Sequence, residues 1–180
     1  MNIVPEVFVS NEQGQFEIDV FRWQELALAV LEAEKVVPNA ELAVMFVEES
    51  VISELNERYM GKQGPTDVLS FPIAVEEADS GRVPDNGSSG PEFTSPMFDR
   101  PKVLLGDVVI CPAVASRNCF EHKGDRLHRG TLDDEIALLL VHGILHLRGM
   151  DHEEEGEAEV MEAKEDVYLK AYYFDGELQR

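Results

Sequence analysis

The sequence predicts an α+β fold, in which a small mixed β-sheet packs with about five helices. Short apolar runs of strand length alternate irregularly with longer segments whose apolar residues recur at helical spacing. Of the 180 residues, 44% are apolar and 28% are charged, which is enough apolar content for the core of one domain of moderate size. No internal repeat is visible. We therefore expect a single domain spanning residues 1–180.

The first half of the chain predicts three strands separated by two helices. Apolar residues such as Trp23, Leu26 and Val30 recur at helical spacing, and Pro38 ends that helix. The second helix carries Ile52 and Leu55 on one face. The expected elements are a strand at 2–9, a helix at 18–37, a strand at 42–47, a helix at 48–59 and a strand at 67–73.

A change of composition follows. Residues 76–100 are rich in Gly, Pro, Ser and Asp and have no sustained period, which predicts a long mobile loop inserted between strands. The apolar run VLLGDVVI at 103–110 predicts a strand, and 111–120 predicts a helix. A polar, partly basic connector at 121–130 precedes the next helix.

That next helix is expected over residues 132–147. Thr131 can cap its first turn, and the acidic residues at 133–135 suit the positive end of the helix dipole. Gly149 is expected to end it, because glycine accepts positive φ. A last, acidic helix is expected over 153–173.

Net charge and segment composition limit the function classes. The net charge of −21 opposes a polyanionic partner, but the acids are concentrated at the two ends, because residues 1–57 hold 12 acids and 2 bases. A local basic groove in the middle of the chain stays possible. The N-terminal segment lacks the pattern of a signal peptide, and the run IALLLV is too short to span a bilayer, so we expect a cytoplasmic protein without a membrane partner. Cys111 and Cys119 are interpreted as reduced thiols, one or both in the core.

Three histidines form the strongest candidate site. His142 and His146 are four residues apart on the predicted helix, so their side chains project from one face with Cβ atoms about 5–6 Å apart. The chain can turn back at Gly149 and bring His152 to the same ion. Three imidazole ligands leave one position open for water, as in catalytic zinc sites. We predict one zinc ion per chain on His142, His146 and His152.

The spacing of these histidines matches the extended zincin pattern HExxHxxGxxH, but Gly143 occupies the position of the glutamate base. Peptide hydrolysis is therefore less favoured than phosphodiester hydrolysis, in which the metal itself activates water. Two alternatives stay open: a metalloprotease-like hydrolase, and a non-catalytic protein in which the metal only stabilises the fold.

Three segments resemble the YbeY family of bacterial metal-dependent endoribonucleases. They are LNERYMGKQGPTDVLSFP (55–72), LLGDVVICP (104–112) and HGILHLRGMDH (142–152), and they occur in the family's order. The resemblance implies zinc on the three histidines, hydrolysis of single-stranded RNA in ribosomal RNA maturation and ribosome quality control, and the small ribosomal subunit as partner. With the ribosome as the implied partner, the non-catalytic alternative is a ribosome-assembly factor with a structural metal. The oligomeric state is not predicted.

Other residues receive weaker assignments. Many family members have an arginine where this chain has Met60, so Arg58 is a candidate for the catalytic arginine, with a solvated surface charge as the equal alternative. Asp151 is a candidate to orient a ligand histidine or to serve the turn. Thr66, Asp67 and Ser70 are expected to make turn and strand-end hydrogen bonds. A further group could contact phosphates or be merely solvated: Arg117, Lys123, Arg126, Arg129 and Arg148.

Overall fold

The structure is a computed structural model, and it describes residues 4–73, 102–125, 127–150 and 155–175. Its sheet has four strands in the order β1-β2-β4-β3. Neighbours β1, β2 and β4 are parallel, and β3 pairs antiparallel with β4 at the edge. The predicted mixed sheet is therefore confirmed. The strands are β1 (Glu6–Asn11), β2 (Ala40–Phe46), β3 (Val68–Pro72) and β4 (Val103–Ile110).

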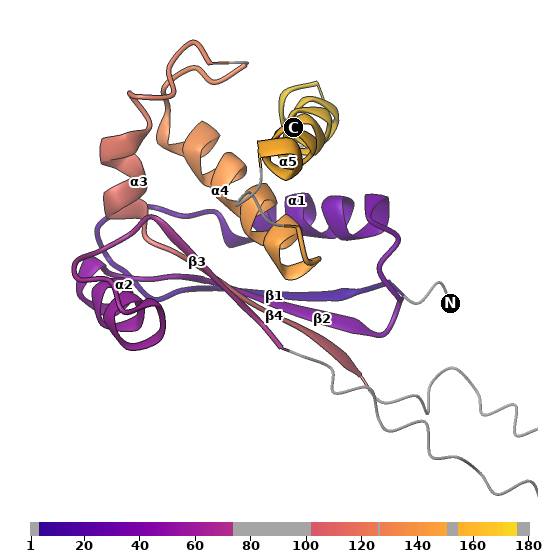
Figure 1. The fold of residues 1–180 in the computed structure, drawn as a ribbon, viewed down its shortest axis with the longest axis horizontal. Coiled ribbons are helices and arrows are strands. Elements are labelled where there is room, and N and C mark those ends of the chain that lie inside the picture. The colour runs from indigo at the N-terminus through magenta and orange to yellow at the C-terminus, as the bar shows by residue number, and fades with distance from the viewer. Residues whose placement is uncertain (1–3, 74–101, 126, 151–154, 176–180) are drawn as a thin grey trace, which may run out of the picture.

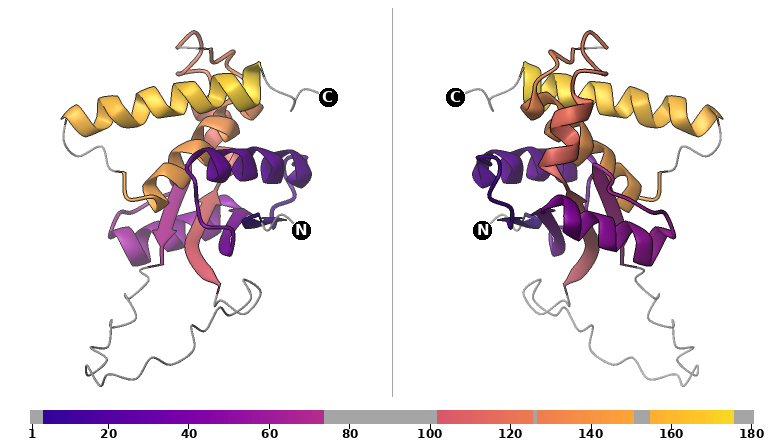
Figure 2. Two further views of the ribbon diagram at one scale, coloured as in Figure 1. Left: turned by 90° about the vertical axis from the view of Figure 1, so that its right-hand side faces the viewer. Right: turned by 90° about the vertical axis from the view of Figure 1, so that its left-hand side faces the viewer.

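The helices surround this sheet unevenly. In Figures 1 and 2, α1, α4 and α5 are stacked over one face, and α2 lies against the opposite side. Two π-helical segments continue α2 and α5, so the helix predicted over 48–59 is divided in two. The helices are α1 (Val20–Ala33), α2 (Glu49–Leu55), η1 (Asn56–Met60), α3 (Pro112–Asn118), α4 (Leu132–Leu147), α5 (Glu155–Tyr168) and η3 (Leu169–Phe174). The loop predicted at 76–100 lies outside the described residues.

The hydrophobic core is divided by the sheet. Alternate residues of β2, such as Leu42 and Val44, are buried with apolar residues of α1 and α4. The opposite face of the sheet packs Val109 of β4 against Ile52 of α2 in a smaller cluster. Successive side chains of β2 point to opposite faces of the sheet, so this strand lies between helices on both sides. Within the described residues, no helix is both long and apolar enough to cross a membrane.

Helix α4 lies at the centre of the larger core cluster. The hydroxyl of Thr131 accepts a hydrogen bond from the backbone N–H of Asp134, which confirms the predicted N-cap. Asp134 and Glu135, which lie in the first turn near the positive end of the helix dipole as predicted, are both buried. Asp134 is bound by the Arg129 guanidinium and by the Tyr173 hydroxyl, at 2.5 and 2.8 Å. These bonds connect the start of α4 to the end of η3.

The last helix is fixed to the rest of the fold by polar contacts. Lys164 donates to the Glu34 carboxylate at 2.6 Å, and the Tyr168 hydroxyl donates to the same oxygen. Both partners lie on α5, whereas Glu34 directly follows α1. Cys111 and Cys119 are buried free thiols, as the sequence predicts. Burial raises the pKa of each thiol above its ordinary value.

Candidate active site

His142 and His146 lie on successive turns of α4, and the structure brings their rings together. The two Nε2 atoms are 3.0 Å apart, and the ring planes meet at 82°. Both residues are partly exposed at the end of the helix that leads to Gly149. Two imidazole nitrogens at this separation can share one cation, since zinc–nitrogen bonds of about 2.0–2.1 Å span it. The predicted pairing of the two side chains is therefore found.

Glu165 on α5 orients the first of these rings. Its carboxylate oxygen Oε1 lies 2.8 Å from Nδ1 of His142, and the side chain is only 5% exposed. A carboxylate beside Nδ1 keeps the ring proton on that nitrogen, so the lone pair of Nε2 faces His146. This is the relationship commonly found behind histidine ligands of zinc.

The sequence interpretation missed Glu165 and named Asp151 for this task. A signal was present: Met161, Glu165 and Leu169 are spaced four apart along the last helix, and all three are buried. An acid inside an apolar helical stripe needs a polar partner in the core. Asp151 lies outside the described residues, so its predicted role stays untested.

The chain turns after α4 as predicted. Gly149 has a φ of +83°, its N–H donates to the carbonyl of His146, and the N–H of Met150 donates to the carbonyl of Leu145. These two hydrogen bonds form a Schellman motif, which requires a residue in the left-handed backbone conformation. His152 lies outside the described residues. The turn leads toward it, and its place as third ligand stays a prediction.

Gly143 brings α4 close to the sheet. A Cβ atom on this glycine would lie 2.7 Å from Cγ1 of Val108, and the Ser70 hydroxyl donates to the Gly143 carbonyl at 3.2 Å. There is no room for a glutamate at this position, which explains in physical terms why the zincin base is absent. Ser70 therefore links β3 to α4, a tertiary role beyond the strand-end bond expected for it.

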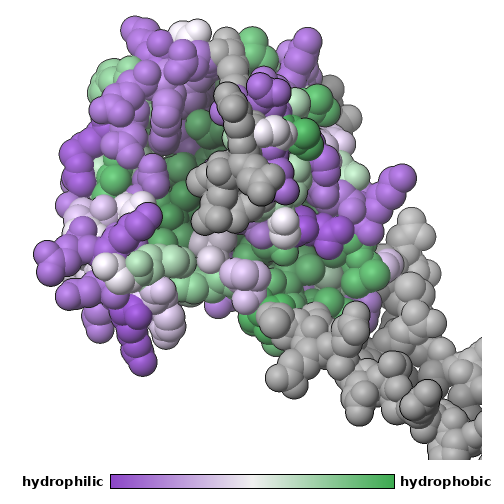
Figure 3. Space-filling model, viewed as in Figure 1, coloured by the Kyte–Doolittle hydropathy of each residue, from purple (hydrophilic) through white to green (hydrophobic). Residues whose placement is uncertain are grey.

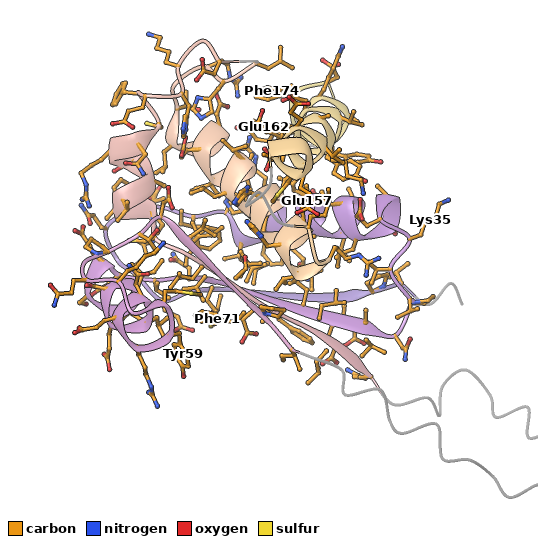
Figure 4. The ribbon with its side chains drawn as sticks, viewed as in Figure 1. Lys35, Tyr59, Phe71, Glu157, Glu162 and Phe174 are labelled. Atoms are coloured by element: carbon orange, nitrogen blue, oxygen red, sulfur yellow. The ribbon has the colours of Figure 1, made fainter. Side chains whose placement is uncertain are left out.

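A cleft of about 980 Å³ lies beside His142. Its walls are the connector between α3 and α4, one face of α4, and the facing side of α5 and η3. Carboxylates line it, among them Glu162 and Glu165 of α5. On the face drawn in Figure 3, apolar side chains lie among hydrophilic ones over these elements, and Figure 4 places Glu162 and Phe174 along this side of the last helix. The cleft can therefore receive an extended ligand next to His142.

Arg58 lies apart from α4, in the η1 segment that follows α2. It is exposed on η1, with its guanidinium carbon 5.3 Å from the ring centre of Tyr59. Tyr59 in turn packs edge-to-face on Phe71 of β3, as Figure 4 shows. Met60 is also exposed. The structure thus holds Arg58 on an aromatic surface next to β3, and its predicted catalytic role stays untested.

The basic residues named as candidates for phosphate contact are mostly paired. Arg129 binds the buried Asp134, Arg117 binds Glu49 at 2.9 Å, and Arg148 lies 3.8 Å from Glu34. Lys123 is exposed, and Arg126 lies outside the described residues. Thr66 and Asp67 make the expected bonds at the start of β3, where Asp67 accepts from the N–H of Val68.

A second histidine cluster was missed by the sequence interpretation. His122 and His128 of the connector meet Glu135 of α4, and one ligand atom from each lies within 4.8 Å of the others, so that they could hold a metal ion. A hydrogen bond with Glu135 raises the pKa of His122 above its usual value, although burial acts in the opposite direction. The available signal was the pair of histidines six residues apart just before an acid-rich helix start.

Comparison with known proteins identifies the group to which the chain is related. A model of the endoribonuclease YbeY family matches residues 8–173. The chain belongs to the YbeY family. The endoribonuclease YbeY of Frankia casuarinae is 44% identical over 155 residues, covering 86% of this chain and 68% of that protein. That of Acidothermus cellulolyticus is 40% identical over 169 residues, covering 94% and 92%.

A solved structure has a similar fold. The solution structure of TM1509 from Thermotoga maritima matches with a TM-score of 0.52 and 25% identity, over 91% of this chain and 87% of that one. The YbeY resemblance predicted from three sequence segments is thus confirmed. Membership makes the chain a nuclease, an enzyme of the hydrolase class.

Proposed function

We propose that this chain is a zinc-dependent endoribonuclease that cleaves single-stranded RNA in the cytoplasm. Its substrates would be ribosomal RNA precursors, and its partner the small ribosomal subunit, in RNA maturation and ribosome quality control. The observation that carries the metal part is the 3.0 Å approach of the His142 and His146 Nε2 atoms, with Glu165 behind His142. The names of the curated relatives carry the RNA part.

The side chains fit one zinc ion. His142 and His146 would hold it, and His152, three residues after the Gly149 turn, would be the third ligand. Three nitrogen ligands form the open class of site, with one position left for substrate or water. A bound zinc ion would supply Lewis acidity toward a phosphoryl oxygen and would lower the pKa of a water molecule.

The chain's own residues prepare this chemistry. Glu165 keeps the proton on Nδ1 of His142 and thereby fixes the direction of Nε2. Gly143 fits against Val108, so no carboxylate on that turn of α4 can act as the general base of a peptidase. The cleft beside His142 gives an extended strand a place to lie across the helix.

The central experiment compares RNA cleavage with and without a chelator, for the wild-type chain and for the variants His142→Ala and His146→Ala. Cleavage of single-stranded regions of ribosomal RNA is expected to need metal, and each variant should lose both activity and bound zinc. Asp133→Asn, an exposed change on the same helix, is the matched control and should keep both. Retention of activity and zinc by both histidine variants would overturn the assignment.

Two further measurements separate the alternative functions. Casein hydrolysis by the zinc-loaded chain would indicate a metalloprotease-like hydrolase instead. Co-sedimentation with small ribosomal subunits that persists in the histidine variants, without any RNA cleavage by the wild-type chain, would indicate an assembly factor.

A further inference from the structure

His122 and His128, which line the same cleft as His142, form a cluster with Glu135. Nδ1 of His122 lies 2.8 Å from Oε2 of Glu135, and Nε2 of His128 lies 3.0 Å from the same oxygen. Glu135 is fully buried and His128 is 9% exposed, while His122 is partly open to solvent. Two imidazoles and one carboxylate thus converge from two segments of the chain, the connector and the first turn of α4.

Polar atoms of this cluster are buried without hydrogen-bond partners. Oε1 of Glu135 and Nε2 of His128 both lack one, since the short approach of His128 to Oε2 does not have the geometry of a hydrogen bond. A buried carboxylate with an unmatched oxygen is costly in an apolar interior. A cation held between the three side chains would satisfy both atoms. No other described residue is bonded to Oε1.

The charge of the cleft also favours cations. Its described lining residues include six acids, three histidines and one lysine: Asp67, Asp125, Asp134, Glu162, Glu165, Asp166, His122, His128, His142 and Lys170. Arg129 pairs with Asp134, and a cation bound in the cluster would add positive charge beside the cleft and so reduce the repulsion of phosphate groups. A bound cation is a large local positive charge and would favour a nucleic-acid strand in such a cleft.

We propose that His122, His128 and Glu135 hold a second divalent cation, and that the ligand set of two imidazoles and one carboxylate selects zinc. Three protein ligands of this composition are typical of zinc sites that keep one open position. The bound cation links the connector to α4 and adds positive charge beside the cleft. None of these three ligands belongs to the proposed site at His142.

The two sites are too far apart to act on one phosphate. Glu135 and His142 are seven residues apart on α4, which corresponds to about 10 Å along the helix axis. Two-metal catalysis needs ions about 3.5–4 Å apart. The second cation therefore attracts and positions a strand, while the reaction takes place at His142.

Loading this site changes one hydrogen bond. In the structure the backbone N–H of Gly130 donates to Nδ1 of His128 at 3.0 Å, so the neutral ring carries its proton on Nε2. A cation on Nε2 requires that proton to move to Nδ1, and the bond from Gly130 is then lost. The turn at 128–130 consequently rearranges when metal binds, which gives the proposal a readout that is independent of activity.

The test is zinc stoichiometry after equilibrium dialysis. We expect two ions per wild-type chain, and one in His122→Ala and in the isosteric variant Glu135→Gln. Asp133→Asn, an exposed acid at the start of the same helix, is the control and should retain two. The double variant His142→Ala/His146→Ala should retain one ion, which is lost when His122→Ala is added. This last comparison separates the second site from the proposed active site.

Circular dichroism shows whether each variant is folded, and the partly exposed His122 makes its variant the less disruptive of the two. Zinc should still raise the melting temperature of the His142→Ala/His146→Ala variant, and amide exchange at Gly130 should change on loading. The proposal is wrong if His122→Ala and Glu135→Gln, both folded, bind as many zinc ions as the wild-type chain.

Discussion

Nδ1 of His142 and Oε1 of Glu165 lie 2.8 Å apart and join the middle of α4 to α5. This contact makes the orientation of a metal-ligand candidate depend on a different helix. Replacing Glu165 with alanine should lower zinc affinity about 10- to 100-fold, because His142 loses the group that fixes its tautomer. Glu165→Gln should lose less, since the amide oxygen can still accept from Nδ1. Competition with a chromophoric chelator measures both.

Glu159→Ala is the matched control for this change, because Glu159 is an exposed acid on the same helix. Its zinc affinity should equal that of the wild-type chain. An unchanged affinity in Glu165→Ala, with the fold intact, would show that the bond has no role in metal binding.

The close contact at Gly143 predicts a stability loss. An alanine there would place Cβ 2.7 Å from the stiff side chain of Val108, and overpacking of this kind costs about 1–3 kcal/mol. Better helix propensity returns at most about 1 kcal/mol. Urea unfolding should therefore show a net loss in the free energy of unfolding. Gly156→Ala is the control: its Cβ meets nothing within 4 Å, so the change should be neutral or stabilising, and equal effects would contradict the packing argument.

Asp134 predicts a dependence of stability on pH. Burial alone would raise the pKa of this carboxyl, but hydrogen bonds from Arg129 and Tyr173 outweigh it and lower the pKa from 3.8 to about 2. A carboxyl with a lowered folded-state pKa contributes stability above pH 3.8 and loses it as the pH falls toward 2. The contribution is about 2 kcal/mol.

The variant Asp134→Asn isolates that contribution. It should be less stable than the wild-type chain by about 3 kcal/mol near neutral pH, because Arg129 and Tyr173 lose a buried charged partner. The difference between the two proteins, measured by urea unfolding, should narrow below pH 3.8. Asp133→Asn, at an exposed ion pair, should change stability by less than about 1 kcal/mol. A difference that stays constant down to the lowest pH would contradict the assignment.

Arg58 can be tested by the salt dependence of RNA binding. If its guanidinium contacts a phosphate, Arg58→Ala should weaken binding of single-stranded RNA and reduce the slope of log affinity against log salt by about 1. Lys35→Gln, at the far side of the fold in Figure 4, should leave the slope unchanged. Equal slopes in all three proteins would leave Arg58 as a solvated surface charge.

Much of the fold could be predicted because local patterns and tertiary packing agree. The short apolar run of β2 and the capped, apolar α4 are both visible in the sequence, and both elements are found. Two features were not foreseeable in the same way. The π-helical η1 arises after α2 and ends at Gly61 in a left-handed conformation, which helical periodicity does not distinguish from a longer α-helix. The antiparallel pairing of β3 with β4 at the edge of the sheet depends on tertiary contacts, which local sequence patterns do not show.

The site was predictable where its residues lie on one helix, and not where it depends on contacts between elements. His142 and His146 follow from spacing four apart. Glu165 approaches them only because α5 packs across α4, and Glu135 meets two histidines only because the connector returns to the helix start. Buried acids in apolar stripes were the available clue, and the acidic composition of the chain concealed it.

The contact between His142 and Glu165 has a consequence for the order of synthesis. A ribosome releases the two histidines of α4 before the helix that carries the orienting carboxylate, 23 residues later. During that interval the imidazole of His142 is free to rotate, so the nascent chain cannot yet favour one tautomer. Capture of the proposed zinc ion in the oriented geometry is therefore expected only after α5 docks.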